Sequence, residues 1–284
     1  MVDFLAPITM AEALRIRHEQ QVIPFAGGTD LMVLQRSWAG TLPGFDRTIL
    51  YLGDIAELKL IRQNGGLLEI GAAATLTDLL AHPAVPDILK QAVAQMASPA
   101  IRNRGTLGGN LCNASPAADT APPLYAAGAA VQLQNAAGSR LLPLEAFILG
   151  PGRTALAGDE LLTSIHLPLQ PFNWTLYRKV GTRKANALAK LSFAGLAQID
   201  NQAIGDIRFA FGAVAPTVVR SQEIEALLRG RLIGEIPYLA DEISDQYAHL
   251  ILPIDDQRSS SRYRKTVALR LLADFLDQLA ESAR

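Results

Sequence analysis

The sequence predicts an α+β protein of two domains, and three observations support that prediction. In the first half, two strand-like runs around a turn signal indicate a hairpin at residues 58–72, and strand character resumes on both sides of residues 135–138. Three closely spaced runs in the second half indicate a largely antiparallel sheet. The 284 residues exceed most single domains, and Pro168, Pro171 and Asn173 interrupt the pattern. We therefore expect domains of residues 1–172 and 173–284.

The first domain is expected to begin with a helix over residues 8–20. Thr9 is its N-cap and Glu12 follows three residues later, as in a capping box. A strand, a glycine turn and a helix follow over residues 22–35. Further strands are expected at 48–52, 58–62, 67–72, 131–134, 139–142 and 160–167, and helices from residue 77 and over 87–96. Residues 98–123 are rich in Gly, Asn, Ser, Pro and Ala, and residues 101–120 within them are expected to form a long loop.

The second domain is expected to contain strands at 175–180, 191–199 and 207–214. Two helices should close the chain, at 221–228 and 261–279. The last helix places apolar residues on one face, namely Val267, Leu271, Leu272, Phe275 and Leu279.

Composition and charge argue against several classes of function. Hydrophobic residues make up 49% and charged residues 19%, as in a globular protein with a sizeable core, and the formal net charge of -1 does not favour nucleic acid as a partner. The single cysteine, Cys112, cannot form a disulfide within the chain or ligate an iron–sulfur cluster or zinc, and the four histidines show no ligand spacing. No leader pattern and no apolar run long enough for a bilayer is present, so we expect a cytoplasmic protein without a membrane segment.

The first candidate site is the turn at residues 24–31, which follows a predicted strand and precedes a predicted helix. Gly27 and Gly28 let backbone amides approach an anion without an intervening Cβ, and Thr29 adds a hydroxyl. The positive end of a following helix would help to hold a phosphate or pyrophosphate. An isolated turn of this kind can also be purely structural, and the turn matches neither G-x-G-x-x-G nor the P-loop.

The second candidate site is the glycine-rich stretch at residues 101–120. Gly105, Gly108 and Gly109 again allow close backbone approach, and short polar side chains such as Asn110 and Asn113 supply donors and acceptors. A loop of this length in a compact domain is usually functional or disordered. Two such turns about 80 residues apart can hold an elongated dinucleotide from two directions, which makes the pair stronger evidence than either turn alone.

These segments resemble a known family. The runs at residues 26–30, 106–110 and 115–119 are similar to the FAD subunit of the xanthine dehydrogenase and carbon monoxide dehydrogenase family, the molybdenum hydroxylases. The resemblance continues through residues 150–152, 160–165, 177–183 and 210–216 to the terminal segment that begins at Tyr263, so it covers nearly the whole chain.

The resemblance implies a fold and a set of FAD contacts. The fold would be a two-subdomain FAD-binding domain of the vanillyl-alcohol-oxidase (PCMH) type, followed by a smaller α+β domain. The turn at 24–31 would wrap the pyrophosphate. By matching position, the implied FAD-binding residues are Pro24, Phe25, Ala26, Gly27, Gly28, Thr29, Asp30, Leu31, Met96, Ala97, Ile101, Thr106, Gly109, Asn110, Asp119, Leu162 and Lys179. Met96 stands where animal members commonly carry an aromatic residue beside the flavin ring, and a thioether cannot stack as a phenyl ring does. Some family members carry a cysteine-rich insertion that binds an extra iron–sulfur cluster, and this sequence lacks that insertion.

Several of these residues have a second interpretation. Lys179 near a reduced, anionic flavin would favour reduction of that flavin by Coulombic attraction. It also lies in a basic run, and lysines in such runs are mostly exposed to solvent. Asp119 either accepts a hydrogen bond from flavin or ribose, or caps the helix that Pro122 helps to start. Cys112 is expected to be a small packing residue. Asp54 and Glu57 resemble a carboxylate pair, but we assign them no catalytic role.

By resemblance, the chain would be an electron-transfer subunit. A molybdopterin-binding large subunit would oxidise substrate, a [2Fe-2S] small subunit would deliver electrons, and FAD in this chain would pass them to NAD or another acceptor. The resemblance favours the xanthine dehydrogenase branch. Two alternatives are a stand-alone flavin oxidoreductase with its own substrate, and an assembly protein without flavin. The chain shows no acid–base constellation for the first, and the paired glycine turns argue against the second.

Overall fold

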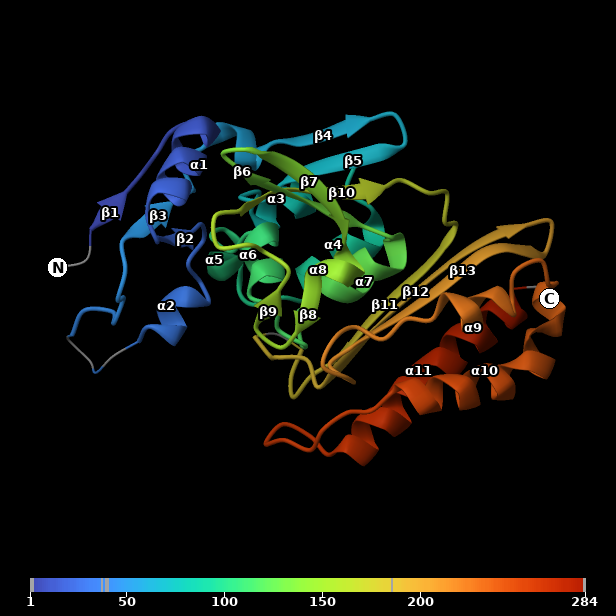
Figure 1. The fold of residues 1–284 in the computed structure, drawn as a ribbon. Coiled ribbons are helices and arrows are strands. Elements are labelled where there is room, and N and C mark those ends of the chain that lie inside the picture. The colour runs from blue at the N-terminus through green and yellow to red at the C-terminus, as the bar shows by residue number, and fades with distance from the viewer. Residues whose placement is uncertain (1–2, 37, 39–40, 185, 283–284) are drawn as a thin grey trace. The chain divides into compact units, whose positions relative to one another are not determined.

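A computed structural model describes residues 3–36, 38, 41–184 and 186–282 of the chain (Figure 1). The chain forms two compact units, and each unit is built from three separate segments of the sequence. The first unit comprises Met1–Val85, Ala97–Ala114 and Ala129–Pro168, and the second comprises Pro86–Met96, Ser115–Gly128 and Leu169–Arg284. The expected division into residues 1–172 and 173–284 stays a prediction.

The first unit opens with a small parallel sheet. Its strands are β1 (Phe4–Leu5), β3 (Ile49–Tyr51) and β2 (Ile23–Phe25), in that order. Helix α1 (Met10–Glu19) begins at Thr9, whose hydroxyl accepts the N–H of Glu12 at 3.3 Å, so the predicted N-cap is confirmed. Helix α2 (Leu31–Leu34) is a single turn that follows β2. Leu50, Val22 and Ala13 are buried in the core beneath this sheet.

A five-stranded antiparallel sheet forms the rest of the core of the first unit. Its order is β4 (Ile61–Asn64), β5 (Leu67–Gly71), β10 (Leu161–Pro168), β6 (Ala130–Asn135) and β7 (Gly138–Pro143). The predicted hairpin is present as β4 and β5, and the strands expected on both sides of residues 135–138 form the pair β6 and β7. The expected strand at 58–62 is partly wrong, because residues Ala56–Lys59 form the 3₁₀ helix η1. There Leu58 turns into the core, and its carbonyl lies against Gly71, whose lack of a Cβ permits that contact.

The stretch expected to be one long loop contains short helices instead. Helices α5 (Pro99–Arg102) and α6 (Leu107–Cys112) are separated by a turn, and α3 (Leu76–Ala81) and α8 (Leu144–Phe147) complete the helices of the first unit. Ser98 and Thr106 cap α5 and α6 with their hydroxyls. These caps offset the poor helix propensity of a glycine-rich sequence. A two-stranded ladder, β8 (Ile148–Gly150) with β9 (Arg153–Thr154), lies beyond α8.

The second unit is a three-stranded antiparallel sheet packed with helices. The strands are β11 (Trp174–Val180), β12 (Leu191–Asp200) and β13 (Ala203–Gly212), as expected from the sequence. Helices α4 (Asp87–Ala94) and α7 (Ala121–Ala127) contact the sheet, as does α11 (Ser261–Glu281), which pairs with α10 (Ile236–Leu250) (Figure 1). Helices α9 (Gln222–Ala226) and η2 (Ile233–Glu235) connect these elements. Five aromatic rings fill the core, those of Phe193, Phe209, Phe211, Tyr247 and Phe275.

Helix α10 is the largest element that the sequence did not reveal. Only Ile236, Ile243 and Tyr247 are buried along its 15 residues. Three buried positions make a weak 3.6-residue period, so the pattern did not predict a helix there. The helix is stabilised by packing on α11 rather than by an apolar stripe of its own.

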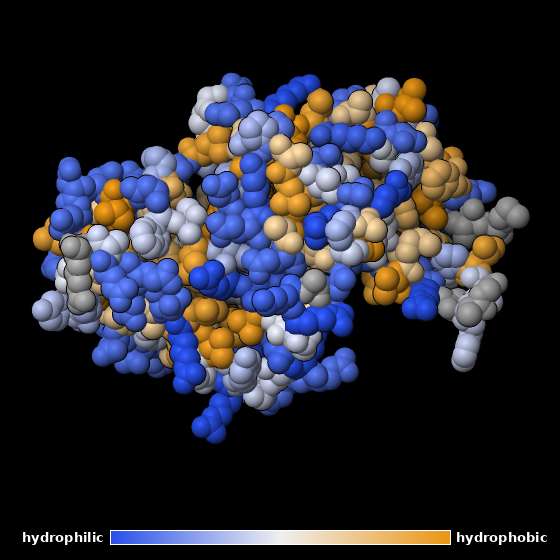
Figure 2. Space-filling model, turned by 180° about the vertical axis from the view of Figure 1, so that it is seen from behind, coloured by the Kyte–Doolittle hydropathy of each residue, from blue (hydrophilic) through white to orange (hydrophobic). Residues whose placement is uncertain are grey.

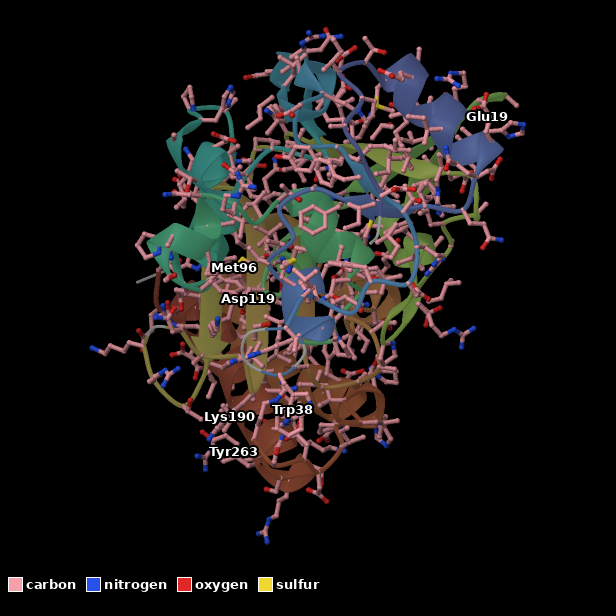
Figure 3. The ribbon with its side chains drawn as sticks, turned by 90° about the vertical axis from the view of Figure 1, so that its left-hand side faces the viewer. Glu19, Trp38, Met96, Asp119, Lys190 and Tyr263 are labelled. Atoms are coloured by element: carbon pink, nitrogen blue, oxygen red, sulfur yellow. The ribbon has the colours of Figure 1, made fainter. Side chains whose placement is uncertain are left out.

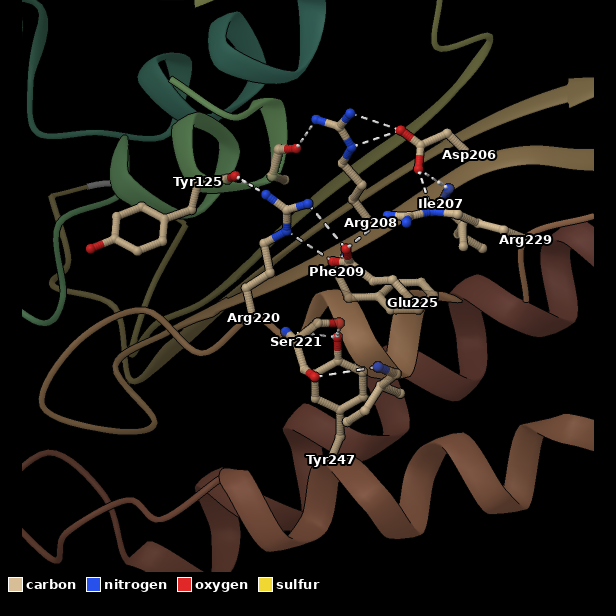
Figure 4. Close-up of polar contacts among 12 residues, drawn as sticks. Tyr125, Asp206, Ile207, Arg208, Phe209, Arg220, Ser221, Glu225, Arg229 and Tyr247 are labelled. Carbon is tan, nitrogen blue, oxygen red and sulfur yellow. Dashed lines mark hydrogen bonds and ion pairs between the residues drawn. The ribbon is translucent and has the colours of Figure 1, made fainter. Parts of the chain in front are cut away.

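Two arginine side chains, each also part of an ion pair, connect α7 to the rest of the second unit (Figure 4). Arg220 holds Glu225 with two hydrogen bonds of 3.0 Å and donates to the carbonyl of Tyr125 at 2.8 Å. Arg208 bonds Asp206 at 2.8 Å and donates to the carbonyl of Ala126 at 3.0 Å. Two guanidinium groups therefore bind the last carbonyls of α7, at the end of the helix where positive charge is favourable.

The surface is of mixed character on the face drawn in Figure 2, where hydrophobic and hydrophilic residues are interspersed. Among the described residues, no helix has both the length and the apolar composition needed to cross a membrane. The same residues contain no group of three or more His, Cys, Asp or Glu side chains that could hold a metal ion.

Candidate functional site

The turn between β2 and α2 presents unbonded backbone donors. Within the described part of the chain, the N–H groups of residues 27–30 have no hydrogen-bond acceptor. Gly28 has a φ of 72°, and a Cβ at this residue would lie 2.1 Å from the ring of Phe25. Only glycine adopts this conformation without strain. A row of free N–H groups on a turn is the arrangement that binds phosphate oxygens. Because α2 is a single turn, the N–H groups, and not a long helix dipole, are the important feature.

The second glycine-rich turn is organised differently. Leu107 and Gly108 donate their N–H groups to the carbonyls of Ala74 and Ala72 at 3.1 and 2.9 Å. Gly109 donates to the Thr106 hydroxyl at 3.1 Å. A Cβ on Gly108 would lie 2.6 Å from the carbonyl oxygen of Ala72. Gly108 therefore allows α6 to pack on the segment after β5, whereas the sequence had suggested approach to a ligand.

The two turns lie against each other in the first unit. A Cβ on Gly27 would lie 2.0 Å from the carbonyl oxygen of Arg104, and one on Gly105 would lie 3.4 Å from the Thr29 hydroxyl. The sequence did not single out Arg104, because a backbone carbonyl leaves no signal in residue type. The close contact places the free N–H groups of the first turn beside the start of α6.

In the second unit, two of the implied FAD residues bind each other. The Lys179 ammonium lies 2.6 Å from the Asp119 carboxylate and donates to the carbonyl of Gln95 at 3.1 Å. The Tyr177 hydroxyl donates to the other carboxylate oxygen of Asp119 at 3.1 Å. The Lys179 and Asp119 side chains are only 7% and 9% exposed, so the interpretation of Lys179 as a solvated surface lysine is wrong. Figure 3 labels Asp119 and also Met96, which follows Gln95 directly.

Burial has the largest effect on the pKa values of Asp119 and Tyr177. It raises the pKa of Asp119 above its ordinary value, while the Lys179 ammonium and the Tyr177 hydroxyl oppose that rise. Burial, together with the neighbouring Asp119 carboxylate, raises the pKa of Tyr177 well above its ordinary value. Tyr177 is thus a hydrogen-bond donor at any physiological pH. The sequence analysis missed it, although the period of two along a strand places residues 177 and 179 on one face.

The remaining implied contacts are distributed over both units. Met96 is buried, Ala97 has a φ of 44°, and Ile101 is 43% exposed. Leu162 is buried on β10, beside an irregularity in its pairing with β6. Cys112 is accessible to solvent at the end of α6, yet the surrounding protein raises the pKa of its thiol to about 12 through burial, so the expected packing role stays a prediction.

These features fit the diphosphate of a dinucleotide. The free N–H groups of residues 27–30 provide donors, and Gly28 adopts the positive φ of this turn and leaves room for the Phe25 ring. Gly28 and its neighbours form a site whose donors the protein itself does not use. A dinucleotide cofactor would satisfy them.

Comparison with known proteins places the chain in a class. Residues 1–170 match the FAD binding domain in molybdopterin dehydrogenase, and residues 176–279 match the CO dehydrogenase flavoprotein C-terminal domain. A chain of carbon monoxide dehydrogenase from Hydrogenophaga pseudoflava has the same fold, with a TM-score of 0.87, 26% identity and coverage of 97% of this chain and 96% of that one. The expected α+β fold of an FAD-binding part and a C-terminal part is confirmed.

Two curated relatives make the class more specific. A putative xanthine dehydrogenase FAD-binding subunit from Escherichia coli K12 is 30% identical, with 93% of this chain and 92% of the relative covered. A glyceraldehyde dehydrogenase medium chain from Sulfolobus acidocaldarius is also 30% identical, with 96% of each chain covered. The chain belongs to the family of FAD-binding medium subunits of the molybdenum hydroxylases. It is an oxidoreductase subunit, and its cofactor is FAD.

Proposed function

We propose that this chain is the electron-transfer subunit of a three-chain molybdenum hydroxylase. An iron–sulfur subunit would supply electrons that a molybdopterin-binding subunit takes from substrate, and NAD or another acceptor would receive them. The relatives named as FAD-binding subunits or medium chains support this arrangement. When bound, FAD supplies an acceptor that collects two electrons and releases them together or singly.

The free N–H groups of residues 27–30 carry the proposal for the cofactor site. We propose that they bind the FAD diphosphate and that the other implied residues, including Thr106, Asn110, Leu162 and Lys179, contact the rest of the cofactor. The backbone donors would offset the charge of the diphosphate without any lysine or arginine side chain. The chain itself then binds and orients FAD.

A xanthine dehydrogenase type of complex is the finer proposal. A xanthine dehydrogenase FAD-binding subunit is 30% identical to this chain, but a glyceraldehyde dehydrogenase medium chain has the same identity. The two relatives are named for different substrates, so their equal identity does not decide between those substrates. An experiment must therefore decide whether the complex oxidises a purine or an aldehyde.

The test is to purify the tagged chain from its native host and to identify the co-eluting chains, their metals and the bound flavin. We expect a large subunit with molybdenum, a small subunit with iron, and FAD in this chain. The complex should oxidise xanthine faster than aldehydes and should reduce NAD. Oxidation of an aldehyde but not of xanthine would overturn the xanthine type, and a dye as the sole acceptor would overturn NAD.

The alternative is a stand-alone flavin oxidoreductase with a substrate of its own. It would require an acid–base pair beside the flavin, and the buried Lys179 and Asp119 are bonded to each other. Turnover of an organic substrate by the isolated FAD-loaded chain, without partner chains, would favour this alternative. Isolation as a single chain with no molybdenum or iron would point the same way.

A further inference from the structure

The polar face of the five-stranded sheet carries a cavity of about 170 Å³. The cavity belongs entirely to the first unit, and α1, β4, β5, β6 and β10, which contribute to it, lie together at the top of Figure 1. Within the described part of the chain, the residues that line it include none of the implied FAD contacts, and Leu162 precedes Thr163 on β10 without lining it. The cavity is therefore distinct from the proposed cofactor site.

A bulge in β10 supplies the floor of this cavity with two hydroxyl groups. Leu162 pairs with Leu133 of β6, but Ser164 pairs with Gln132, so β10 has one extra residue, Thr163. In a regular strand, Thr163 and Ser164 would point to opposite faces of the sheet. Here both line the cavity, and they are only 7% and 4% exposed. A bulge that re-aims a side chain in this way is common beside binding sites.

Two glutamine amides on β6 add hydrogen-bonding groups that the chain leaves unused. The Ser164 hydroxyl donates to the amide oxygen of Gln132 at 3.2 Å, and His166 Nε2 lies 3.2 Å from the same oxygen. The Gln132 amide is planar, so its NH₂ group points away from this contact, and it has no acceptor among the described residues. Gln134 lines the cavity two residues further along, and its amide is likewise unbonded in the part of the chain that the structure describes.

The wall and the rim of the cavity differ in character. Met10 of α1 and the buried Leu58 of η1 form an apolar wall. The exposed rim carries Glu57, Glu69 and Arg62, which make no ion pair with any described residue. Two carboxylates and one guanidinium give the rim a net negative charge, which disfavours an anionic ligand. A purely apolar ligand is also disfavoured, because it would leave the amides and hydroxyls without partners.

We infer that this cavity is a second small-molecule site, which takes a neutral heterocycle of one six-membered ring carrying C=O and N–H groups. The size fits, since a cavity of about 150 Å³ holds one benzene ring. Met10 and Leu58 would contact the ring, while Gln132 and Gln134 would bind its polar edge, as glutamine amides do with the edges of nucleobases. The inference does not depend on the proposed electron-transfer function.

The test is a titration of the full FAD-loaded chain with uracil, followed by isothermal titration calorimetry and by Tm. We expect saturable binding of one uracil per chain and a Tm that rises with uracil concentration, because the ligand binds only the folded state. The FAD content should not change. Two control compounds have a ring of the same size, namely doubly N-methylated uracil, which lacks the N–H groups, and benzoate, which is negatively charged. Neither should bind.

Two variants place the binding in this cavity. Q134L and S164A each remove hydrogen-bonding groups from it, and each should weaken uracil binding by about three- to tenfold while FAD is retained. The matched control is Q63L, the same glutamine change on β4 of the same sheet, at a residue that does not line the cavity. It should bind uracil like the unmodified chain. Q134L carries the test where S164A does not fold, since Gln134 is only half-buried.

Four results would overturn the inference. Absence of uracil binding up to its solubility limit would show that the cavity does not take such a ring. Unchanged binding in Q134L and S164A would place uracil elsewhere on the chain. Equal binding of the N-methylated compound or of benzoate would contradict recognition of a neutral ring through its N–H groups. Release of FAD by uracil would show that the probe had entered the cofactor site instead.

Discussion

In the turn at residues 27–30 the backbone N–H groups have no acceptor among the described residues, whereas in the turn at 107–110 all four are bonded within the chain. Both turns are rich in glycine and both belong to the first unit. In the first turn, Gly28 adopts a positive φ beside open donors. In the second, Gly108 makes room for the backbone of Ala72.

The difference shows that a turn can require glycine for two separate physical reasons. One cause is a conformation that other residues reach only with strain, and the other is the close packing of two backbones. A change in the first turn should therefore affect FAD more than folding. A change in the second should affect folding first, and FAD only as a consequence.

The largest effect is expected for Gly28→Val, which should give flavin-free protein. The β-branched residue at φ 72° costs roughly 1–2 kcal/mol in strain and also meets the Phe25 ring. FAD content is measured by absorbance of the purified chain. The matched control is Gly65→Val, since Gly65 has a φ of 57° in an open hairpin with nothing within 4 Å. Full flavin in the Gly28 variant would contradict the placement of the diphosphate.

A smaller effect is expected for Gly108→Ala, which should lower the free energy of unfolding by about 1–3 kcal/mol through overpacking against Ala72. Denaturant unfolding of the flavin-free chain measures it. Gly66→Ala is the control, because a Cβ there meets nothing within 4 Å. If the Gly108 variant unfolded like the original chain but lost FAD, the distinction between the two turns would fail.

Removal of the α6 cap in Thr106→Ala should cost about 1 kcal/mol in unfolding free energy and should weaken FAD retention. Thr9→Ala removes a comparable cap from α1 and should cost a similar amount without affecting FAD. Thr106→Ser should restore both properties. FAD retention on dilution separates the two positions, and equal retention in both alanine variants would argue against a role of Thr106 at the cofactor.

The smallest effect is expected for Cys112→Ser. Because Cys112 is exposed at the end of α6, the change should alter the unfolding free energy by less than about 0.5 kcal/mol. Thermal unfolding and FAD content together provide the check. A loss of several kcal/mol would confirm the packing role that the sequence suggested.

Local signals in the sequence were read correctly where the physical cause is local. The Thr9 cap, the hairpin turn at Gly65 and Gly66 and the three strands of the second unit were predicted because caps, turns and strand periods depend on neighbouring residues. The loop expected at 101–120 was wrong because Ser98 and Thr106 cap helices in a sequence whose composition indicates a loop. Helix α10 was missed because its stability comes from α11.

By itself, the sequence determined the α+β class, the family and the FAD cofactor, because turn residues at fixed spacings can be recognised without a structure. Only the tertiary structure decided which glycines leave N–H groups free and which make room for another backbone. It also joined Tyr177, Asp119 and Lys179 into one buried cluster. The physical reason is that desolvation and charge pairing depend on distances between residues some 60 positions apart, and residue identity does not encode those distances.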